Sequence, residues 1–287
     1  MASMRDIKRR RSSIQGTQQI TKAMKLVSTV KLQRARASAE RSKDYFTCMY
    51  DTVNNILQRV GHVEHKYLTA GASRKKAVIV ITSNRGLAGG YNSNVTKLVT
   101  RHPRWNKEDV DVYCLGNKGR EAFLRYGYRV KESDNEIVES PTYKDAAALS
   151  EKLLAAFAEG EIGEIYLAYT RFKNTVSHIP TLLKLLPVEV PGEEAAGEKE
   201  ASAIMNFEPE DTEALDLLIP KYVTSLIYGA LREAVASENG ARMQAMDNAT
   251  SNAEEMISDL TLKYNRARQG SITQELTEII AGAEALG

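Results

Sequence analysis

The stretch ARMQAMDNATSNAEEMISDLTLKYNRA, residues 241–267, decides the fold of this 287-residue chain. Alanine and larger apolar residues recur in it about every 3.7 positions, which is the period of one face of an α-helix. Because alanine is small, this face lets a second helix backbone approach closely. The stripe consists of Ala241, Ala245, Ala249, Ala253, Met256, Leu260, Tyr264 and Ala267.

This stretch belongs to a longer run, residues 221–287, that contains no proline. Upstream of it, residues 215–227 carry a bulkier apolar stripe, in which Pro220 should kink the helix or mark its start. A single helix over 221–287 would be about 100 Å long, more than the width of a compact domain of this size. Such a helix needs a partner over most of its length.

The N-terminal region supplies a candidate partner for this helix. Residues 17–60 contain neither glycine nor proline, and Ile20, Met24, Val27 and Val30 fall on one side of the predicted helix. We therefore expect an antiparallel pair of terminal helices, with an insert that returns the chain. The last 24 residues continue as helix and end in small or apolar residues, so we expect this tip to sit inside another protein.

The middle of the chain alternates between short apolar runs and amphipathic segments, which indicates an α/β layer with a mainly parallel sheet. The predicted strands are 77–83, 109–116 and 164–172, with a possible edge strand at 176–188. The predicted helices are 94–101, 118–127 and 143–160. Residues 191–202 read as an acidic linker. The predicted domains are a coiled-coil helix at 1–74, an inserted Rossmann-like α/β domain at 75–207, and a second coiled-coil helix at 208–287.

Composition excludes several classes of function. Hydrophobic residues make up 43% of the chain and charged residues 26%, and the net charge is only +2. No apolar run approaches the roughly 18 residues of a membrane span, and the polar N-terminus lacks a signal-peptide core, which favours the cytosol. The two cysteines, Cys48 and Cys114, are expected to be reduced thiols. No catalytic, cofactor-binding or metal-binding residue is predicted.

Two other interpretations of local motifs stay open. The glycine-rich loop 83–94 joins a predicted strand to a helix, where doubly wound sheets bind phosphates, so a nucleotide-binding enzyme is one alternative. The loop matches neither GxGxxG nor a P-loop, however. Residues 1–43 carry twelve lysines and arginines against two acids, so a basic coiled-coil nucleic-acid-binding protein is another. Aromatic residues do not interleave with this charge, and an acidic protein partner or a solvated face fits it as well.

The two ends of the chain resemble a known family. The segments TQQITKAMKLVSTVKLQRA (17–35) and YNRARQGSITQELTEIIAGA (264–283) are similar to the terminal signatures of the gamma subunit of bacterial F-type ATP synthases. LIYGALREAVASENGARMQAMDNATSNAEEMI (226–257) and ITSNRGLAGGYNSN (81–94) resemble further segments of that family. The likeness follows the chain in order from end to end.

The resemblance implies a non-catalytic central rotor shaft. Its partners would be three alpha and three beta subunits around the tip, and the epsilon subunit and the c-subunit ring at the foot, with no nucleic acid. Membrane association would be indirect, through the c ring, and would place the chain at the cytoplasmic face of the bacterial plasma membrane. Proton flow, or sodium flow in some members, would turn the shaft and drive ATP synthesis at the beta subunits.

The resemblance also implies residue roles. Contacts between rotor and stator would involve Met24, Lys25, Arg242, Arg268, Gln269, Thr273 and Glu275. Contacts of the foot with epsilon and the c ring would involve Phe207, Glu208 and Pro209. The sequence departs from the family where Lys25 replaces a common acid and Asp247 a common lysine. Our hypothesis is that these two opposite changes compensate if the helices place the two residues close together.

Overall fold

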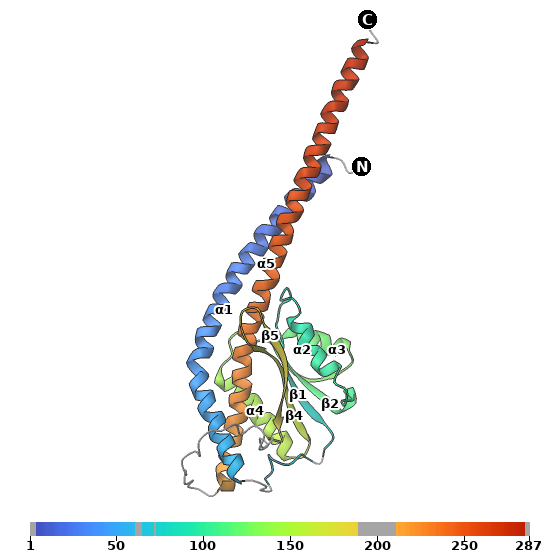
Figure 1. The fold of residues 1–287 in the computed structure, drawn as a ribbon. Coiled ribbons are helices and arrows are strands. Elements are labelled where there is room, and N and C mark those ends of the chain that lie inside the picture. Colours follow the sequence, from blue (N-terminus) through green and yellow to red (C-terminus); the bar gives the residue numbers. More distant parts are fainter. Residues whose placement is uncertain (1–3, 61–64, 72, 189–210, 285–287) are drawn as a thin grey trace. The chain divides into compact units, whose positions relative to one another are not determined.

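The computed structural model describes residues 4–60, 65–71, 73–188 and 211–284, in two compact units. Unit 1 consists of Met1–Thr29 with Arg242–Gly287, and unit 2 of Val30–Ala241. The helices α1 (Met4–Val60) and α5 (Asp211–Glu284) each contribute to both units (Figure 1). Long terminal helices with an inserted α/β sheet confirm the predicted fold class. The predicted linker 191–202 lies outside the described residues.

Unit 2 is built around a five-stranded sheet in the order β3-β2-β1-β4-β5. The strands are β1 (Lys76–Ile81), β2 (Val110–Leu115), β3 (Arg129–Asp134), β4 (Glu164–Phe172) and β5 (His178–Leu186). The first four in this order are parallel, and β5 runs antiparallel to β4. The order 3-2-1-4 is that of doubly wound folds, in which the chain crosses back over its first strand.

The buried strands follow the predictions closely, whereas β3 was not predicted. Strands β1 and β2 are buried on both faces, as expected of parallel strands between two helix layers. Strand β3 has the sequence RVKESD and is mostly exposed. It lies at the edge of the sheet beside β2, where charged side chains discourage pairing with other chains. Because the composition of β3 is polar, a search for apolar runs does not find this strand.

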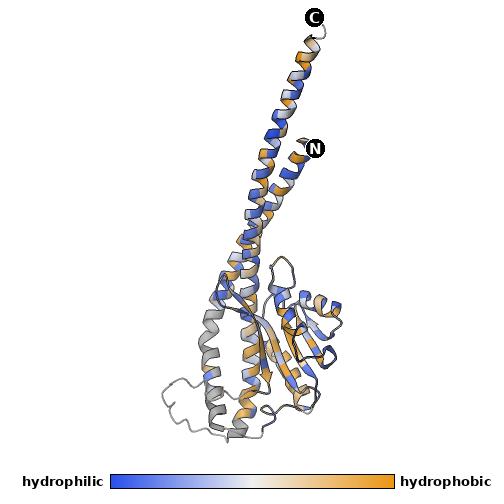
Figure 2. Ribbon diagram, turned by 45° about the vertical axis from the view of Figure 1, so that its right-hand side comes forward, coloured by the Kyte–Doolittle hydropathy of each residue, from blue (hydrophilic) through white to orange (hydrophobic). Residues whose placement is uncertain are grey.

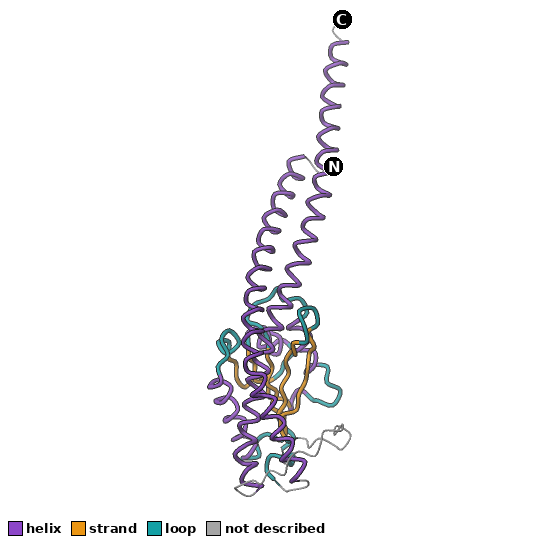
Figure 3. The backbone as a smooth tube through the Cα atoms, turned by 60° about the vertical axis from the view of Figure 1, so that its left-hand side comes forward, coloured by secondary structure: helices purple, strands orange, loops and turns teal. Residues whose placement is uncertain are grey.

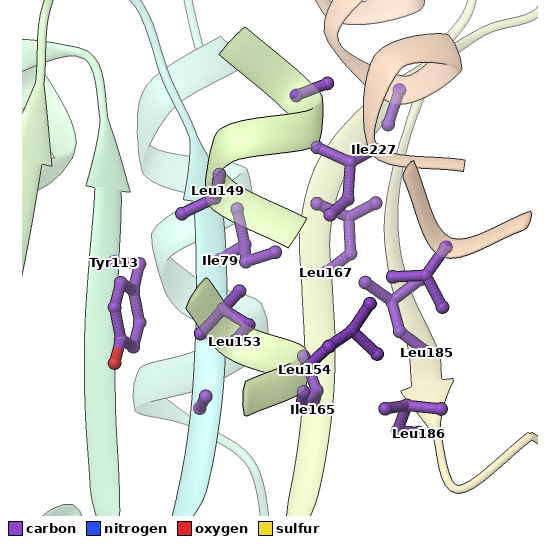
Figure 4. Packing of buried hydrophobic residues seen from close by; sticks show 14 of the residues in the cluster. Ile79, Tyr113, Leu149, Leu153, Leu154, Ile165, Leu167, Leu185, Leu186 and Ile227 are labelled. Carbon is purple, nitrogen blue, oxygen red and sulfur yellow. The ribbon is translucent and has the colours of Figure 1, made fainter. Parts of the chain in front are cut away.

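Helices cover both faces of the sheet, so that alternate strand residues enter two separate clusters. On one face, α2 (Tyr91–Thr100) and α3 (Asn117–Arg125) pack over Val78, Val80 and Val112. On the other, α4 (Tyr143–Ala158) and α5 pack over Ile79 and Leu167. Figure 4 shows Leu149, Leu153 and Leu154 of α4 and Ile227 of α5 directed toward this second cluster.

Helix α5 is unusually enclosed within unit 2. Its buried residues follow the predicted bulky stripe and include Leu215, Ile219, Val223 and Ile227. From residue 222 to residue 241, no position of α5 is exposed. Pro220 lies inside the helix and does not begin it. A helix covered on all sides is typical of a protein core.

Unit 1 is an antiparallel pair formed by the first part of α1 and the last part of α5, which lie side by side in Figures 1 and 3. Buried and half-buried residues of both helices recur at alternating steps of three and four, the heptad pattern of a left-handed coiled coil. On α1 this seam contains Met4, Ile7, Arg11, Ile14, Gln18, Thr21, Lys25 and Ser28. On α5 it contains Met246, Thr250, Ala253, Ile257, Leu260, Tyr264 and Ala267.

The predicted contact face of α1 is wrong. Ile20 is 63% exposed and Val27 57% exposed, and Val30 is exposed as well, so these side chains point away from α5. Thr21 and Ser28, which are small and polar, occupy the seam instead. On α5 the predicted stripe holds for Ala253, Leu260, Tyr264 and Ala267, but Met256 is exposed.

The end of α5 extends past its partner helix as a single helix. Residues 272–283 are all exposed, and they include Ile272, Leu276, Ile279 and Ile280. Ile279 is the most exposed of these, at 69%. Figure 2 shows hydrophobic positions continuing to this end of the helix. Apolar side chains left in water over several turns mark a surface that a partner covers.

Candidate functional site

The glycine-rich loop after β1 is closed by its own hydrogen bonds. The side chain of Thr82 accepts a bond from the amide of Gly119 at 2.8 Å, and that of Asn84 accepts one from the amide of Asn117 at 3.1 Å. Both amides belong to the first turn of α3, so these bonds join the loop to the helix that follows β2. At its other end, the amide of Ser83 donates to Oδ1 of Asn92 in the first turn of α2 at 2.9 Å.

The same loop approaches β2 closely. Gly116 has φ +102°, a conformation that favours glycine, and a β-carbon there would lie 2.2 Å from the carbonyl oxygen of Thr82. Leu87 is exposed and also has a positive φ, of 64°. The structure thus contains a tight turn with backbones in close approach at this loop. Among the described residues, no group of three or more His, Cys, Asp or Glu side chains could hold a metal ion.

A column of polar contacts crosses the seam of unit 1. The Nζ atom of Lys25 lies 2.6 Å from Oδ1 of Asp247, so the condition on which their compensation depends is met. Seven residues earlier on α1, Nε2 of Gln18 donates to Oε1 of Glu254 at 3.1 Å. Polar side chains on the flank of a seam fix the register of a coiled coil.

Two further contacts continue the seam. The hydroxyls of Thr21 and Thr250 share a buried hydrogen bond of 2.8 Å. Arg11, one heptad before residue 18, places its guanidinium carbon 5.5 Å from the ring centroid of Tyr264. The two helices of unit 1 are thus held together by hydroxyl, charge and cation–π contacts in addition to the apolar seam residues. The threonine pair was not predicted, although the heptad spacing of Thr21 and Thr250 with their seam neighbours indicates it.

The residues predicted to contact a stator fall into two groups. Met24, Lys25 and Arg242 are half-buried. Lys25 is engaged with Asp247, so its charge is partly neutralised within the chain.

The second group lies toward the end of α5, where Arg268, Gln269, Thr273 and Glu275 are exposed. The hydroxyl of Thr273 donates to the carbonyl of Gln269 at 2.9 Å, which is a bond internal to the helix. The structure does not bring this group together with the first, since they occupy different turns of unit 1. The predicted foot residues Phe207, Glu208 and Pro209 lie outside the described residues.

Comparison with known proteins decides the family. The family model described as ATP synthase matches residues 3–286. The ATP synthase gamma chain of Lachnoclostridium phytofermentans is 64% identical over 291 residues, which cover 100% of both chains. The chain belongs to the ATP synthase gamma-chain family. Members of this family are the central-stalk subunit of ATP synthase, so the chain is a non-catalytic rotor subunit.

Other relatives of this gamma chain add detail. A sodium-ion-specific ATP synthase gamma chain from Acetobacterium woodii is 40% identical and covers 99% of both chains. Family membership is therefore compatible with either protons or sodium as the coupling ion.

Solved structures show the same fold. A chain in the Euglena gracilis mitochondrial ATP synthase, in a structure of OSCP, F1 and the c ring, matches with a TM-score of 0.67 and 20% identity, covering 98% of this chain and 94% of that one. A chain from the central stalk and c ring of the Tetrahymena thermophila enzyme matches with a TM-score of 0.58 and 23% identity, covering 80% of this chain and 99% of that one. In the described part of this gamma chain, no helix is long and apolar enough to cross a membrane.

Proposed function

We propose that this gamma chain couples rotation of a c-subunit ring to nucleotide turnover at three beta subunits of a bacterial ATP synthase. Three alpha and three beta subunits enclose the end of α5, and the epsilon subunit and the c ring bind the foot. The chain is then a peripheral protein at the cytoplasmic face of the plasma membrane, held there through the c ring. Residues 1–74 and 208–287 form the shaft and residues 75–207 the inserted domain.

The observation that carries this proposal is the exposed end of α5. Over residues 272–283 the helix has no covering from the described part of its own chain, yet it keeps four large apolar side chains. A sleeve of other subunits would remove these side chains from water. The segment carries Glu275 and Glu278 but no lysine or arginine, so strong fixed contacts at any one angle are few. Such a surface can turn inside a sleeve.

Reconstitution tests the proposal directly. The chain is combined with alpha and beta subunits, and rotation of a rod attached to its α/β domain is followed during ATP hydrolysis. We expect ATP-dependent rotation only when the chain is present. Co-purification without rotation, or ATPase activity that does not depend on the chain, contradicts the proposal.

The predicted stator contacts are tested in the membrane-bound complex. Met24→Lys adds a cation where a stator loop is proposed to touch α1, so we expect the ratio of ion pumping to ATP hydrolysis to fall. Met256→Lys adds the same charge at an exposed position of α5 and is the matched control, with a smaller expected effect. An equal ratio in both variants removes Met24 from the set. Measuring uptake of protons and of sodium in the same vesicles identifies the coupling ion.

The foot contacts are tested by retention of epsilon and the c ring. Alanine substitution of Phe207, Glu208 and Pro209 should release epsilon or the c ring from the complex while alpha and beta stay bound. Full retention of both partners contradicts the assignment.

A further inference from the structure

One stretch of α5, residues 233–240, is in contact with several other elements of unit 2. The hydroxyl of Tyr91, the first residue of α2, donates to the carbonyl of Ala234 at 3.2 Å. Ser237 donates its hydroxyl hydrogen to the carbonyl of Thr170 in β4 at 3.0 Å. The two bonds reach α5 from a helix and from a strand, so they fix the helix from different elements.

The end of β4 adds a third bond. The amide of Phe172 donates to Oε2 of Glu233 at 3.3 Å. Burial raises the pKa of the Glu233 carboxyl, while the bond from Phe172 and the charge of Arg171 act to lower it. Glu233 is half-buried, so moving this carboxyl group would break its backbone hydrogen bond with only partial replacement by water.

The fourth contact is steric and involves a glycine. A β-carbon on Gly240 would lie 2.5 Å from Nε2 of His178, the first residue of β5. Glycine is a poor helix former, and here its missing side chain leaves room for the imidazole. Nε2 of His178 is buried and has no hydrogen-bond partner among the described residues. The edge of the imidazole ring therefore packs against the helix through van der Waals contact at Gly240.

The residues between these contacts are small and inaccessible. Ala234, Ala236 and Ser237 are all buried, and no residue from 233 to 240 is exposed. The stretch ends one residue before Ala241, the last residue of unit 2. A helix held through off-axis contacts at several turns resists rotation about its own axis, because every contact must break or shear together.

We propose that residues 233–240 of α5 form a site, here called the torque-transfer seat, through which the α/β domain turns the helix. Tyr91, the end of β4 and the start of β5 contact this seat, and His178 is a positioning residue that packs against Gly240. Torque from the α/β domain enters α5 through these contacts. The inference rests on the proposed rotor function, since a seat for torque has meaning only in a shaft that turns. It adds a site within the chain that the stator and foot contacts do not include.

The test uses the complete complex and the variant Gly240→Ala. The new methyl group must displace the imidazole of His178. We expect the angular variance of a rod on the α/β domain, measured while the motor is stalled, to rise by about twofold, because variance increases as the restraint weakens. The ratio of ion pumping to ATP hydrolysis should fall. Gly16→Ala is the control, because its β-carbon would meet nothing within 4 Å in α1.

A second substitution separates the seat from general damage. His178→Ala removes the obstacle, so the double variant should have the angular variance and the pumping ratio of His178→Ala alone. A double variant whose variance exceeds that of His178→Ala alone overturns the proposal, as does an unchanged variance in Gly240→Ala. If Gly240→Ala does not assemble, Ser237→Ala removes one seat bond and must raise the variance; no rise overturns the seat.

Failure of the rotor function gives a different result. If the unsubstituted chain drives no rotation, the function itself is wrong. If that chain rotates and all seat variants match it in variance, only the seat is wrong.

Discussion

Exchanging the charges of Lys25 and Asp247 gives the sharpest test of how the shaft is held together. Nζ and Oδ1 are 2.6 Å apart, and the two side chains are 38% and 52% exposed. Ion pairs with this exposure contribute about 0.2–1 kcal/mol. We therefore expect a coupling free energy of about 0.5–1 kcal/mol, or a factor of about 2–5 in the equilibrium for local opening.

Hydrogen exchange of the isolated chain measures this equilibrium. Amides in residues 17–28 and 243–256 report on opening of the seam around the pair. Lys25→Asp and Asp247→Lys should each speed exchange, because each variant places two like charges opposite one another. The double exchange should bring the rates close to those of the unsubstituted chain. Raising the salt from about 0.1 M to about 1 M should shrink the differences, since screening shortens to about 3 Å.

Strict additivity of the two single variants would refute the reasoning, because it would mean that the pair contributes no coupling. The complex gives a second outcome. If Lys25 acts only through its ion pair with Asp247 inside the shaft, the double variant keeps the ratio of ion pumping to ATP hydrolysis. If Lys25 contacts the stator through its charge, the double exchange lowers this ratio even though the seam is restored.

Three further predictions follow from unit 2. Gly163→Ala should prevent stable folding, since its β-carbon would lie 1.9 Å from the carbonyl oxygen of Ser73, and circular dichroism of the purified variant would show it; a stable variant contradicts the backbone geometry. Burial raises the pKa of the Cys114 thiol to about 12, so a thiol reagent near pH 8 should modify exposed Cys48 and reach Cys114 only after unfolding, as mass spectrometry can determine. Burial lowers the pKa of His178, so the unfolded chain takes up a proton at this residue before the folded chain does as the pH falls below about 6.5. The folded state should therefore lose stability between pH 7 and pH 5. Thermal melts at these two pH values should show a smaller loss of stability for His178→Gln than for the unsubstituted chain.

The long helices and the buried strands could be predicted because the local amino-acid sequence of each element indicates it. The absence of glycine and proline over residues 17–60 marks most of α1, and the apolar run at 77–83 marks β1. Strand β3 could not be found in this way, because Arg129, Lys131 and Glu132 give it a charged, exposed pattern. Its position depends on pairing with β2, which is a non-local interaction.

The candidate site was predictable to a smaller extent. The sequence drew attention to Lys25 and Asp247 as two opposite departures from the family, and the structure places them 2.6 Å apart, while their compensation stays a prediction. The roles of Met24 and Arg268 stay predictions, because they depend on subunits whose surfaces are not encoded in this chain. The seat around Gly240 was not predicted, since a glycine inside a helix gives no indication of which side chain occupies the space beside it.

The error in the contact face of α1 has a physical cause that extends to the whole shaft. An apolar stripe was assigned to the partner helix because burial within the chain is the usual reason for such a stripe. In unit 1 the central part of the seam contains Thr21, Ser28 and Ala253, while Ile20 and Val27 face outward. Small seam residues let the helices approach closely but remove little apolar surface from water, so the pair gains little stability from this part of the seam. The outward apolar residues gain stability only when another subunit covers them. The hydrophobic pattern of a rotor shaft therefore combines two demands, folding of the chain and assembly of the complex, and the sequence alone does not separate them.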